Sequence, residues 1–149
     1  MASFHTQVGD TVEFSKTVGE TDVYLFAGIT GDFSPNHTNE SFMQQSAYGR
    51  RIAHGALLVG FMSTASARMQ EQSQARGIDT TPVSLGYDGI RFLKPVYLGD
   101  TVTVTYRVAT IDHERLRTVA EMEVHNQHGE LVSVGKHITK WVPQTAQLS

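Results

Sequence analysis

The stretch GALLVGFMSTASARMQEQSQAR, residues 55–76, decides the fold. Its larger apolar side chains recur at helical spacing, namely Leu57, Leu58, Phe61, Met62, Ala65 and Met69. Small residues fill most of the remaining positions, and no charged side chain occurs before Arg68. A helix that is apolar on nearly every side is buried in its protein. The pattern therefore predicts one long, almost wholly buried helix that ends near Gly77, since glycine commonly terminates helices.

Extended segments lie on both sides of this helix in the sequence. Alternating apolar and polar residues predict strands at 11–14, 83–93, 102–108, 116–124 and 131–142. The sequence NQHG at 126–129 predicts a four-residue hairpin turn. Gly86 and Gly89 indicate a β-bulge or a close backbone approach, because glycine inside a strand often marks one or the other. We expect a further bulge around Gly135 and Lys136, where the alternation is imperfect.

Two short helices are expected before the long one. The first spans about 22–28 with Thr21 as its N-cap, and the second spans about 41–46 with Asn39 as its N-cap. Strands in a run, with the helices gathered in one block, indicate an α+β fold: a single domain over residues 1–149 with an antiparallel sheet against a central helix. The apolar helix requires that the sheet curls around it, that a second subunit covers it, or both.

Composition excludes several classes of protein. The 149 residues are 40% hydrophobic and 18% charged, which is typical of a folded globular domain. A net charge of −3 argues against a nucleic-acid partner, which would require a basic surface. The chain has no cysteine, so disulfides, thiolate metal sites and a cysteine nucleophile are excluded. We expect a cytoplasmic protein without membrane contact, because neither a signal peptide nor an apolar span of about 18 residues is present.

The densest titratable chemistry lies in the stretch GITGDFSPNH, residues 28–37. Gly31 loosens the backbone, and Pro35 cannot lie in the middle of a helix. Asp32 and His37 are therefore expected on one irregular loop. A carboxylate and an imidazole that meet on such a loop can share one water molecule and move its protons.

These residues carry a resemblance to a known family. The stretch GDFSPNH at 31–37 resembles the hydratase motif of the MaoC-like dehydratases and R-specific enoyl-CoA hydratases, which reads Gly, Asp, any residue, Asn, Pro, an aliphatic residue and His. IAHG at 52–55 resembles the entry to that family's central helix, and FLKPVYLGD at 92–100 resembles its strand-to-turn signature. The resemblance covers roughly residues 6–142. It implies the hotdog fold, an antiparallel sheet wrapped around a long helix.

The resemblance also implies roles for single residues. Asp32 and His37 would be the catalytic pair: Asp32 takes a proton from water, while His37 orients the water and supplies or relays a proton to C2 of the enoyl thioester. The backbone N–H of Gly55, at the start of the long helix, would hold the thioester oxygen. His54 either contacts the substrate or hydrogen-bonds a neighbouring loop. Ser63 would help to seat the catalytic pair or the acyl group, or would only satisfy its own helix backbone.

Two positions depart from the family's motif. Ser34 replaces the usual Asn before the proline and remains a candidate for substrate binding, although its side chain is shorter. Asn36 replaces the usual aliphatic residue before the histidine. An unpartnered amide in an apolar acyl tunnel would cost about 1–3 kcal/mol. We therefore expect short, branched or polar acyl groups, unless Asn36 points to bulk water.

The remaining charged residues give weaker signals. Four histidines of the strand region show no metal-ligand spacing, namely His113, His125, His128 and His137. We expect no metal and no cofactor, because the CoA thioester would itself be the substrate. Four basic residues are candidates for binding the phosphates of CoA or an acidic acyl group, namely Arg50, Arg51, Arg91 and Lys94.

The resemblance thus implies a hydratase or dehydratase that interconverts trans-2-enoyl-CoA and R-3-hydroxyacyl-CoA. Two alternatives remain open: an acyl-CoA thioesterase of the hotdog superfamily, and a hotdog module that binds acyl-CoA without catalysis. The apolar central helix favours a homodimer or a dimer of dimers.

Overall fold

The structure is a computed structural model that describes residues 5–145. In chain order its elements are β1 (Thr11–Thr17), α1 (Glu20–Thr30), α2 (Pro35–Thr38), α3 (Glu40–Gln44), α4 (Gly55–Gln74), β2 (Thr80–Phe92), β3 (Thr101–Asp112), β4 (Arg117–His125) and β5 (Leu131–Pro143). No helix within the described residues is both long enough and apolar enough to cross a bilayer.

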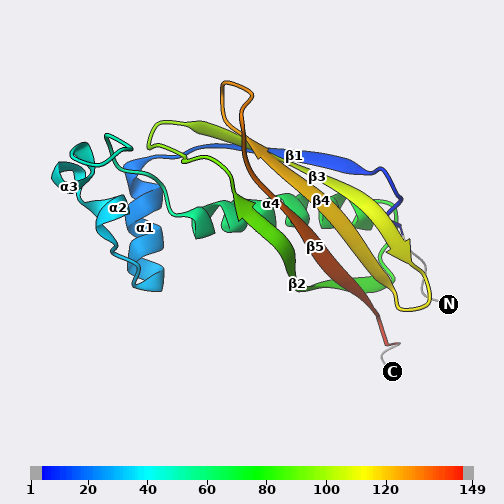
Figure 1. The fold of residues 1–149 in the computed structure, drawn as a ribbon. Coiled ribbons are helices and arrows are strands. Elements are labelled where there is room, and N and C mark those ends of the chain that lie inside the picture. Colours follow the sequence, from blue (N-terminus) through cyan, green and yellow to red (C-terminus); the bar gives the residue numbers. More distant parts are fainter. Residues whose placement is uncertain (1–4, 146–149) are drawn as a thin grey trace.

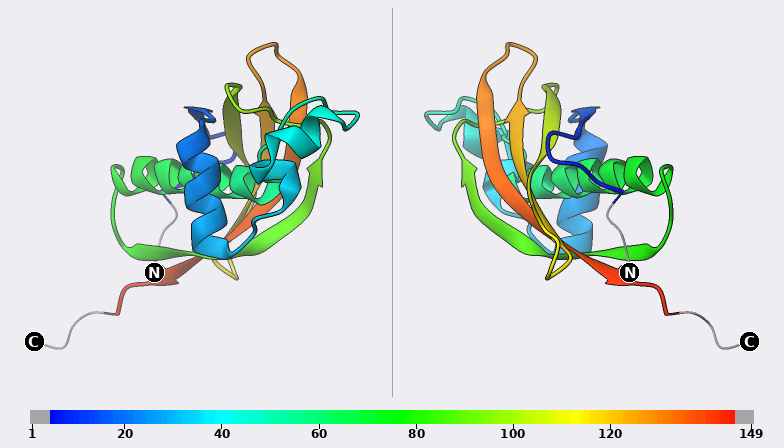
Figure 2. Two further views of the ribbon diagram at one scale, coloured as in Figure 1. Left: turned by 90° about the vertical axis from the view of Figure 1, so that its left-hand side faces the viewer. Right: turned by 90° about the vertical axis from the view of Figure 1, so that its right-hand side faces the viewer.

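The five strands form one antiparallel sheet in the order β1-β3-β4-β5-β2. The sheet curves around α4, which runs along its concave side (Figures 1 and 2). The short helices α1, α2 and α3 gather beyond the N-terminal end of α4 (Figure 1). This arrangement confirms the predicted α+β fold, and it brings the loop between α1 and α2 to the start of α4.

One side of α4 forms the core together with the inner face of the sheet. Leu58, Met62 and Ala65 belong to the same buried cluster as Val104 of β3 and Val124 of β4. Residues along β3 alternate between buried and more exposed, as expected for a sheet with one covered face. Full burial of one such side chain contributes about 1.5–3 kcal/mol. These contacts therefore hold α4 firmly against the sheet.

The opposite side of α4 is exposed in the single chain. It carries small residues at helical spacing, namely Ala56, Gly60, Ser63 and Ala67. The prediction that this helix is buried nearly all round is therefore wrong for one chain. Small uncharged residues occur both in cores and on exposed faces, so the sequence pattern could not separate the two sides.

Of the two predicted N-cap residues, one is confirmed and the other is wrong. Asn39 caps α3 as predicted, because its side-chain oxygen accepts a backbone N–H of the first turn at 3.0 Å. Thr21 is not the N-cap of α1. That helix begins directly after Gly19, whose backbone N–H donates to the Asp22 carboxylate at 2.8 Å.

The predicted bulges lie in β2 alone. The pairing of β2 with β5 shifts register near Gly86 and again near Gly89, which confirms the first prediction. The second prediction is right about the place but wrong about the strand. The shift near Gly89 lies opposite Gly135, between the pairs Asp88–Lys136 and Arg91–Val134, with the extra residue in β2, whereas β5 pairs regularly with β4. A Cβ atom on Gly135 would lie 2.5 Å from the Ile90 side chain. This glycine therefore allows a close approach from β2 and does not bulge its own strand.

Candidate active site

The loop that carries Asp32 is fixed at both ends. Gly31 ends α1 in the left-handed conformation with φ of 84°, and its N–H donates to the Ala27 carbonyl at 2.8 Å. The Asp32 carboxylate then accepts the backbone N–H of Ser34 at 3.2 Å. Pro35 is the first residue of α2, a position that suits proline because no N–H is needed there. The irregular segment is thus only residues 31–34, shorter than expected.

His37 lies on the short helix α2 and not on the irregular loop that was expected. Its Nδ1 lies 2.7 Å from the backbone carbonyl of Ile52. A carbonyl oxygen only accepts hydrogen bonds, so Nδ1 must carry a proton. The Ile52 N–H donates in turn to the Asn36 carbonyl at 3.1 Å. These contacts orient the imidazole so that Nε2 is the nitrogen that can exchange a proton.

His54 is the N-cap residue of α4 and is 1% exposed. Its Nε2 donates to the backbone carbonyl of Asp32 at 2.9 Å, so it hydrogen-bonds a neighbouring loop, one of the two alternatives drawn from the sequence. Its ring packs against that of His37 with centroids 3.8 Å apart. The remaining nitrogen, Nδ1, is buried and finds no partner among residues 5–145.

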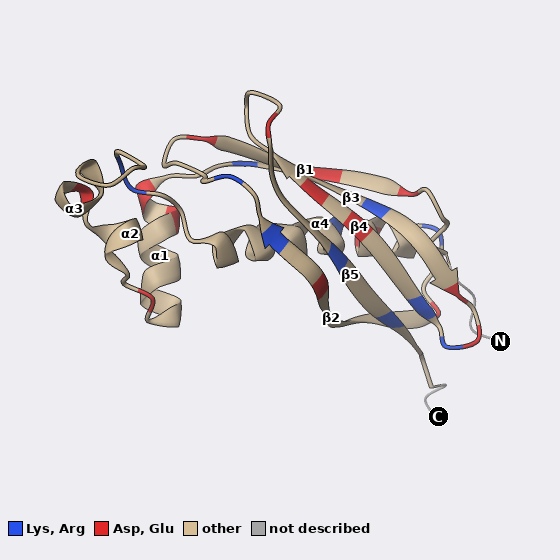
Figure 3. Ribbon diagram, viewed as in Figure 1, with Lys and Arg blue, Asp and Glu red and all other residues tan. Residues whose placement is uncertain are grey.

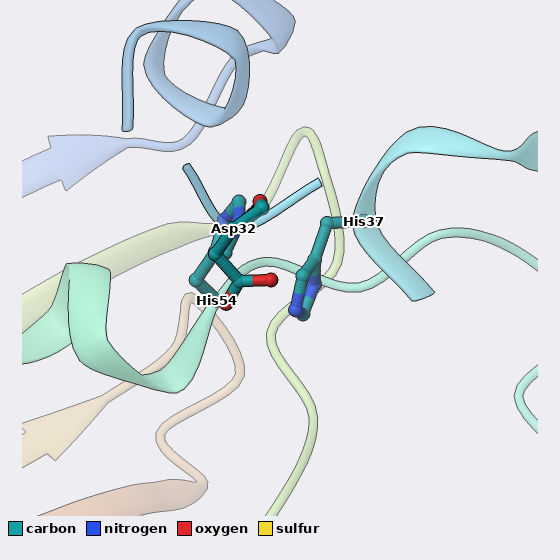
Figure 4. Close-up of side chains that lie close together, drawn as sticks. All are labelled: Asp32, His37 and His54. Atoms are coloured by element: carbon teal, nitrogen blue, oxygen red, sulfur yellow. Dashed lines mark hydrogen bonds between the residues drawn. The ribbon is translucent and has the colours of Figure 1, made fainter. Parts of the chain in front are cut away.

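Asp32, His37 and His54 form one compact cluster (Figure 4). One ligand atom from each residue lies within 4.8 Å of the other two. Such a cluster can hold a water molecule, and its donor set could also bind a divalent cation. Local spacing in the sequence does not indicate this three-residue set, because its members come from separate segments that only the fold brings together. That no metal binds stays a prediction.

A cavity of about 300 Å³ opens beside the cluster. Its walls are mostly apolar and are made by His37, Tyr48, Ile52, Ala53, Gly55, Leu58, Phe92, Leu93, Lys94, Pro95 and Val96. His37 and Gly55 thus face the same space. As the first residue of α4, Gly55 has a backbone N–H with no acceptor inside its own helix. Because this N–H lies at the positive end of a 20-residue helix, the cavity favours a partial negative charge there.

Gly55 also makes room for a side chain that the sequence did not indicate. A Cβ atom at this position would lie 2.8 Å from the ring of Phe92, too close for any real contact. The glycine therefore lets the aromatic ring at the end of β2 close one wall of the cavity. From the sequence, Phe92 was only part of a family-like stretch, and nothing local indicated its contact with Gly55.

Other residues predicted for the site lie outside the cavity lining. Ser63 lies on the exposed side of α4, and Asn36 is exposed on α2. Ser34 is half-buried, and it contributes through its backbone, which donates to Asp32 and accepts the N–H of His37 at 3.0 Å. The Ile52 carbonyl, which orients His37, could not be predicted, because a backbone carbonyl is present at every residue and the sequence does not show which one His37 contacts.

Known proteins resemble this chain in sequence and in structure. A family model described as the MaoC like domain matches residues 3–131. An (R)-specific enoyl-CoA hydratase of Rhodospirillum rubrum is 35% identical over 107 residues, which cover 72% of this chain and 69% of that relative. A 3-hydroxybutyryl-CoA dehydratase of Methylorubrum extorquens is 35% identical over 111 residues, which cover 74% of this chain and 66% of that relative.

Among solved structures, an (R)-hydratase from A. caviae involved in PHA biosynthesis matches with a TM-score of 0.80 and 28% identity. The match covers 93% of this chain and 98% of that one. This agreement confirms the predicted hotdog fold. The two sequence relatives are named as a hydratase and a dehydratase, both of which are hydro-lyases. With most of its length matched by the family model, the chain belongs to the MaoC-like domain family.

Proposed function

We propose that this chain is a hydro-lyase that interconverts trans-2-enoyl-CoA and (R)-3-hydroxyacyl-CoA. The observation that carries the proposal is the cluster of Asp32, His37 and His54, whose ligand atoms lie within 4.8 Å of one another. The cluster lies beside a cavity that is also lined by Gly55, the first residue of a long helix, whose N–H has no acceptor inside that helix. A bound water and a thioester oxygen could therefore be held a short distance apart.

In the hydration direction, one water molecule lies between the Asp32 carboxylate and Nε2 of His37. Asp32 takes a proton from this water while the water oxygen bonds to C3 of the enoyl group. Protonated His37 gives its Nε2 proton to C2, and the double bond between C2 and C3 becomes a single bond. Transfer of the proton from Asp32 back to His37 completes the cycle. Dehydration follows the same steps in reverse.

Negative charge develops on the thioester oxygen as the water attacks. The N–H of Gly55 at the start of α4 would donate to this oxygen, and the helix dipole would add to the attraction. No metal or further cofactor takes part in the proposed cycle, since the CoA thioester is the substrate.

The proposed acyl group is short. Its pocket would be the cavity of about 300 Å³, whose apolar walls include Leu58, Phe92 and Val96. The reason for expecting a polar acyl group was Asn36, and this residue is exposed and does not line the cavity. We therefore favour an apolar group of about four to six carbons, the size that such a pocket can enclose. A relative named 3-hydroxybutyryl-CoA dehydratase supports this choice.

A continuous assay with crotonyl-CoA tests the activity. Hydration removes the absorbance of the conjugated thioester and leaves CoA attached to the product, which chiral analysis should identify as the R-3-hydroxy form. Release of free thiol would mean a thioesterase instead. Equilibrium binding without any turnover, over enoyl-CoAs of several lengths, would mean a non-catalytic acyl-CoA-binding module.

We further propose a homodimer formed through β2. This edge strand of 13 residues exposes Val83 and Leu85, and its outer backbone groups have no neighbouring strand within the described chain. Long apolar edges of this kind pair readily with another strand. Pairing would bring a second chain close to Phe92 and so to the cavity.

A cytoplasmic location is part of the proposal, in keeping with a chain that has no cysteine.

A further inference from the structure

A second cavity, of about 260 Å³, adjoins the proposed acyl cavity. Its lining residues are Arg50, Lys94, Pro95, Tyr97, Asp100, Asn126, His128 and Glu130. Lys94 and Pro95 line both cavities, so the two spaces are neighbours along one loop. We propose that the second cavity binds a phosphate group on the pantetheine arm of the thioester. This inference rests on the proposed function and assigns residues to a part of the substrate that the acyl cavity does not hold.

Three segments that are distant in sequence build this second cavity. They are the turn after α3, the loop between β2 and β3, and the hairpin between β4 and β5. The Tyr97 hydroxyl donates to the Tyr48 carbonyl at 3.2 Å, which joins the first two segments. The Asp100 carboxylate accepts the Tyr97 N–H at 2.9 Å and the Gln127 amide at 2.8 Å, which joins the loop to the hairpin. These hydrogen bonds therefore fix the relative positions of the three segments that form the walls of the cavity.

Arg50 supplies the cation with the fewest competing partners. Its guanidinium lies 4.1 Å from the centre of the Tyr97 ring, which holds the side chain over the cavity. Within residues 5–145, no carboxylate forms an ion pair with Arg50. An arginine that is held by an aromatic ring keeps its N–H donors available, and the guanidinium geometry suits phosphate oxygens.

Lys94 stands where the two cavities meet. Its ammonium pairs with the Glu130 carboxylate, and this contact is the main cause that lowers the pKa of Glu130 below its usual value. Asn126 donates to the other oxygen of Glu130 at 3.1 Å. Because an ammonium has three donors, Lys94 can keep this carboxylate and still bind a phosphate oxygen. His128 lines the same cavity and offers a further nitrogen.

The other two basic candidates from the sequence are occupied or lie elsewhere. Arg51 pairs with both Glu20 and Glu40, which together raise its pKa, so its charge is already neutralised. Arg91 donates to the neighbouring Ile90 carbonyl and lines neither cavity. Figure 3 shows basic segments in the loop before α4 and in the loop after β2. Of the four candidates, only Arg50 and Lys94 meet at one cavity.

The catalytic cluster, the acyl cavity and the second cavity follow one another in the same order as the corresponding groups of a CoA thioester. The reacting carbons would lie at His37 and the thioester oxygen at Gly55. The pantetheine arm would then leave past Lys94 and Pro95, which are shared by both cavities. A phosphate terminates this arm both in CoA and in the prosthetic group of a carrier protein. The chemistry of the site is thus recognition of a phosphate, whichever carrier presents it.

Three substrates test the assignment: the crotonyl thioesters of CoA, of 4′-phosphopantetheine and of pantetheine, the last of which has no phosphate. For Arg50→Gln we expect kcat/KM to fall about tenfold on the CoA thioester, since one charge-assisted hydrogen bond is lost, and to stay unchanged on the pantetheine thioester. Lys94→Gln should act in the same direction. Arg68→Gln is the matched control, because Arg68 also lies over an aromatic ring, that of Phe14 at 4.9 Å, but lines neither cavity.

An equal loss on the phosphopantetheine thioester would mean that the phosphate on the arm itself occupies the site, which a carrier protein could also present. A loss confined to the CoA thioester would mean that an outer phosphate of the nucleotide binds there, which would overturn the assignment to the phosphate on the arm. Only the first result supports the assignment of Arg50 to the arm's phosphate. Equal losses on all three thioesters, or no loss on any, would overturn it.

Binding of free CoA separates this inference from the proposed function. Calorimetry should give a dissociation constant about tenfold weaker for Arg50→Gln than for the wild type. If the wild type hydrates none of the thioesters but binds CoA in this Arg50-dependent way, the proposed hydratase activity fails while the phosphate site stands. If CoA binds equally to both proteins, the phosphate site is wrong whatever the activity.

Discussion

The imidazole rings of His37 and His54 lie with their centroids 3.8 Å apart, inclined by 30°. The same His54 donates from Nε2 to the backbone carbonyl of Asp32 at 2.9 Å. One buried residue at the start of α4 therefore touches both members of the proposed catalytic pair. Through His54, the distance between Asp32 and His37 depends on the position of α4, whose first N–H would hold the thioester oxygen.

The first prediction concerns the pair itself. Asp32→Asn keeps the shape of the side chain and removes the base, and His37→Gln keeps some hydrogen bonding and removes the proton carrier. Each change should lower kcat on crotonyl-CoA by about 10²–10⁴, the usual contribution of a positioned acid or base. The double variant should be little worse than either single one, because the two groups act as a unit. Near-normal turnover of either single variant would contradict the role given to that residue.

The second prediction treats His54 as a positioning residue. His54→Gln can still donate to the Asp32 carbonyl but loses the ring that packs on His37, whereas His54→Ala loses both contacts. We expect kcat to fall about tenfold for the glutamine variant and further for the alanine variant. KM should change little, because His54 does not line the cavity. Steady-state kinetics at saturating crotonyl-CoA separate these effects, and a rise in KM with unchanged kcat would contradict the positioning role.

The third prediction concerns the contact between Gly55 and Phe92. In Gly55→Ala the new methyl group would lie 2.8 Å from the Phe92 ring, so the ring must move. We expect kcat/KM to fall at least tenfold with little loss of stability, because Phe92 is exposed and can rotate. Adding Phe92→Leu should restore part of the activity by removing the clash.

Gly60→Ala is the matched control for that experiment. It adds the same methyl group to the same helix at a position where a Cβ atom meets nothing within 4 Å. Alanine is the better helix former by about 1 kcal/mol, so this variant should be active and no less stable. If Phe92→Leu gave no recovery, the effect of Gly55→Ala would not arise from the aromatic ring.

Part of this architecture could be predicted because local sequence patterns determine it. The period of residues 55–76 predicted α4 to within two residues, and alternation such as that of 102–108 predicted the strands. The proximity of Asp32 and His37 followed from the motif at 31–37. The exposed side of α4 did not follow, since Ala56 and Ser63 suit a core and a surface equally well.

The parts that could not be predicted depend on which segments meet in space. Nothing near Ile52 in the sequence indicates that its carbonyl orients His37, and nothing near Phe92 indicates that it fills the space beside Gly55. The sequence did not show which basic residues are free to bind an anion. Tertiary contacts show that Arg51 is neutralised by two carboxylates, whereas Arg50 lies over an aromatic ring.

The fourth prediction concerns assembly through β2. Leu85 is 50% exposed on this edge strand, and a lysine there would bring a charge into a strand-to-strand interface. We expect the wild type to show twice the mass of the 16.4 kDa chain by light scattering, and Leu85→Lys to show the mass of one chain. Val8→Lys is the control, since Val8 is 61% exposed but lies outside the sheet. A wild-type monomer at micromolar concentration would rule out this interface.

A buried polar network in the sheet leads to the last prediction. His137 of β5 is 1% exposed, and its two nitrogens contact the Tyr106 hydroxyl at 2.7 Å and the Ser84 hydroxyl at 2.8 Å. Its ring stacks on that of Tyr87 with centroids 4.7 Å apart. No carboxylate contacts this imidazole in the described structure, and burial lowers its pKa from 6.5 to about 4. The folded protein therefore holds His137 neutral.

The stability of the protein should consequently depend on pH through this residue. Above about pH 6.5 His137 is neutral in both the folded and the unfolded chain, and below about pH 4 it is protonated in both. Between these values only the unfolded chain binds the proton, so the free energy of unfolding falls as the pH falls. From pH 7 to pH 5 this amounts to about 2 kcal/mol. His137→Gln keeps an amide that can hydrogen-bond but cannot titrate, and urea unfolding at the two pH values should show this loss for the wild type alone. An equal loss in both proteins would mean that other groups set the pH dependence.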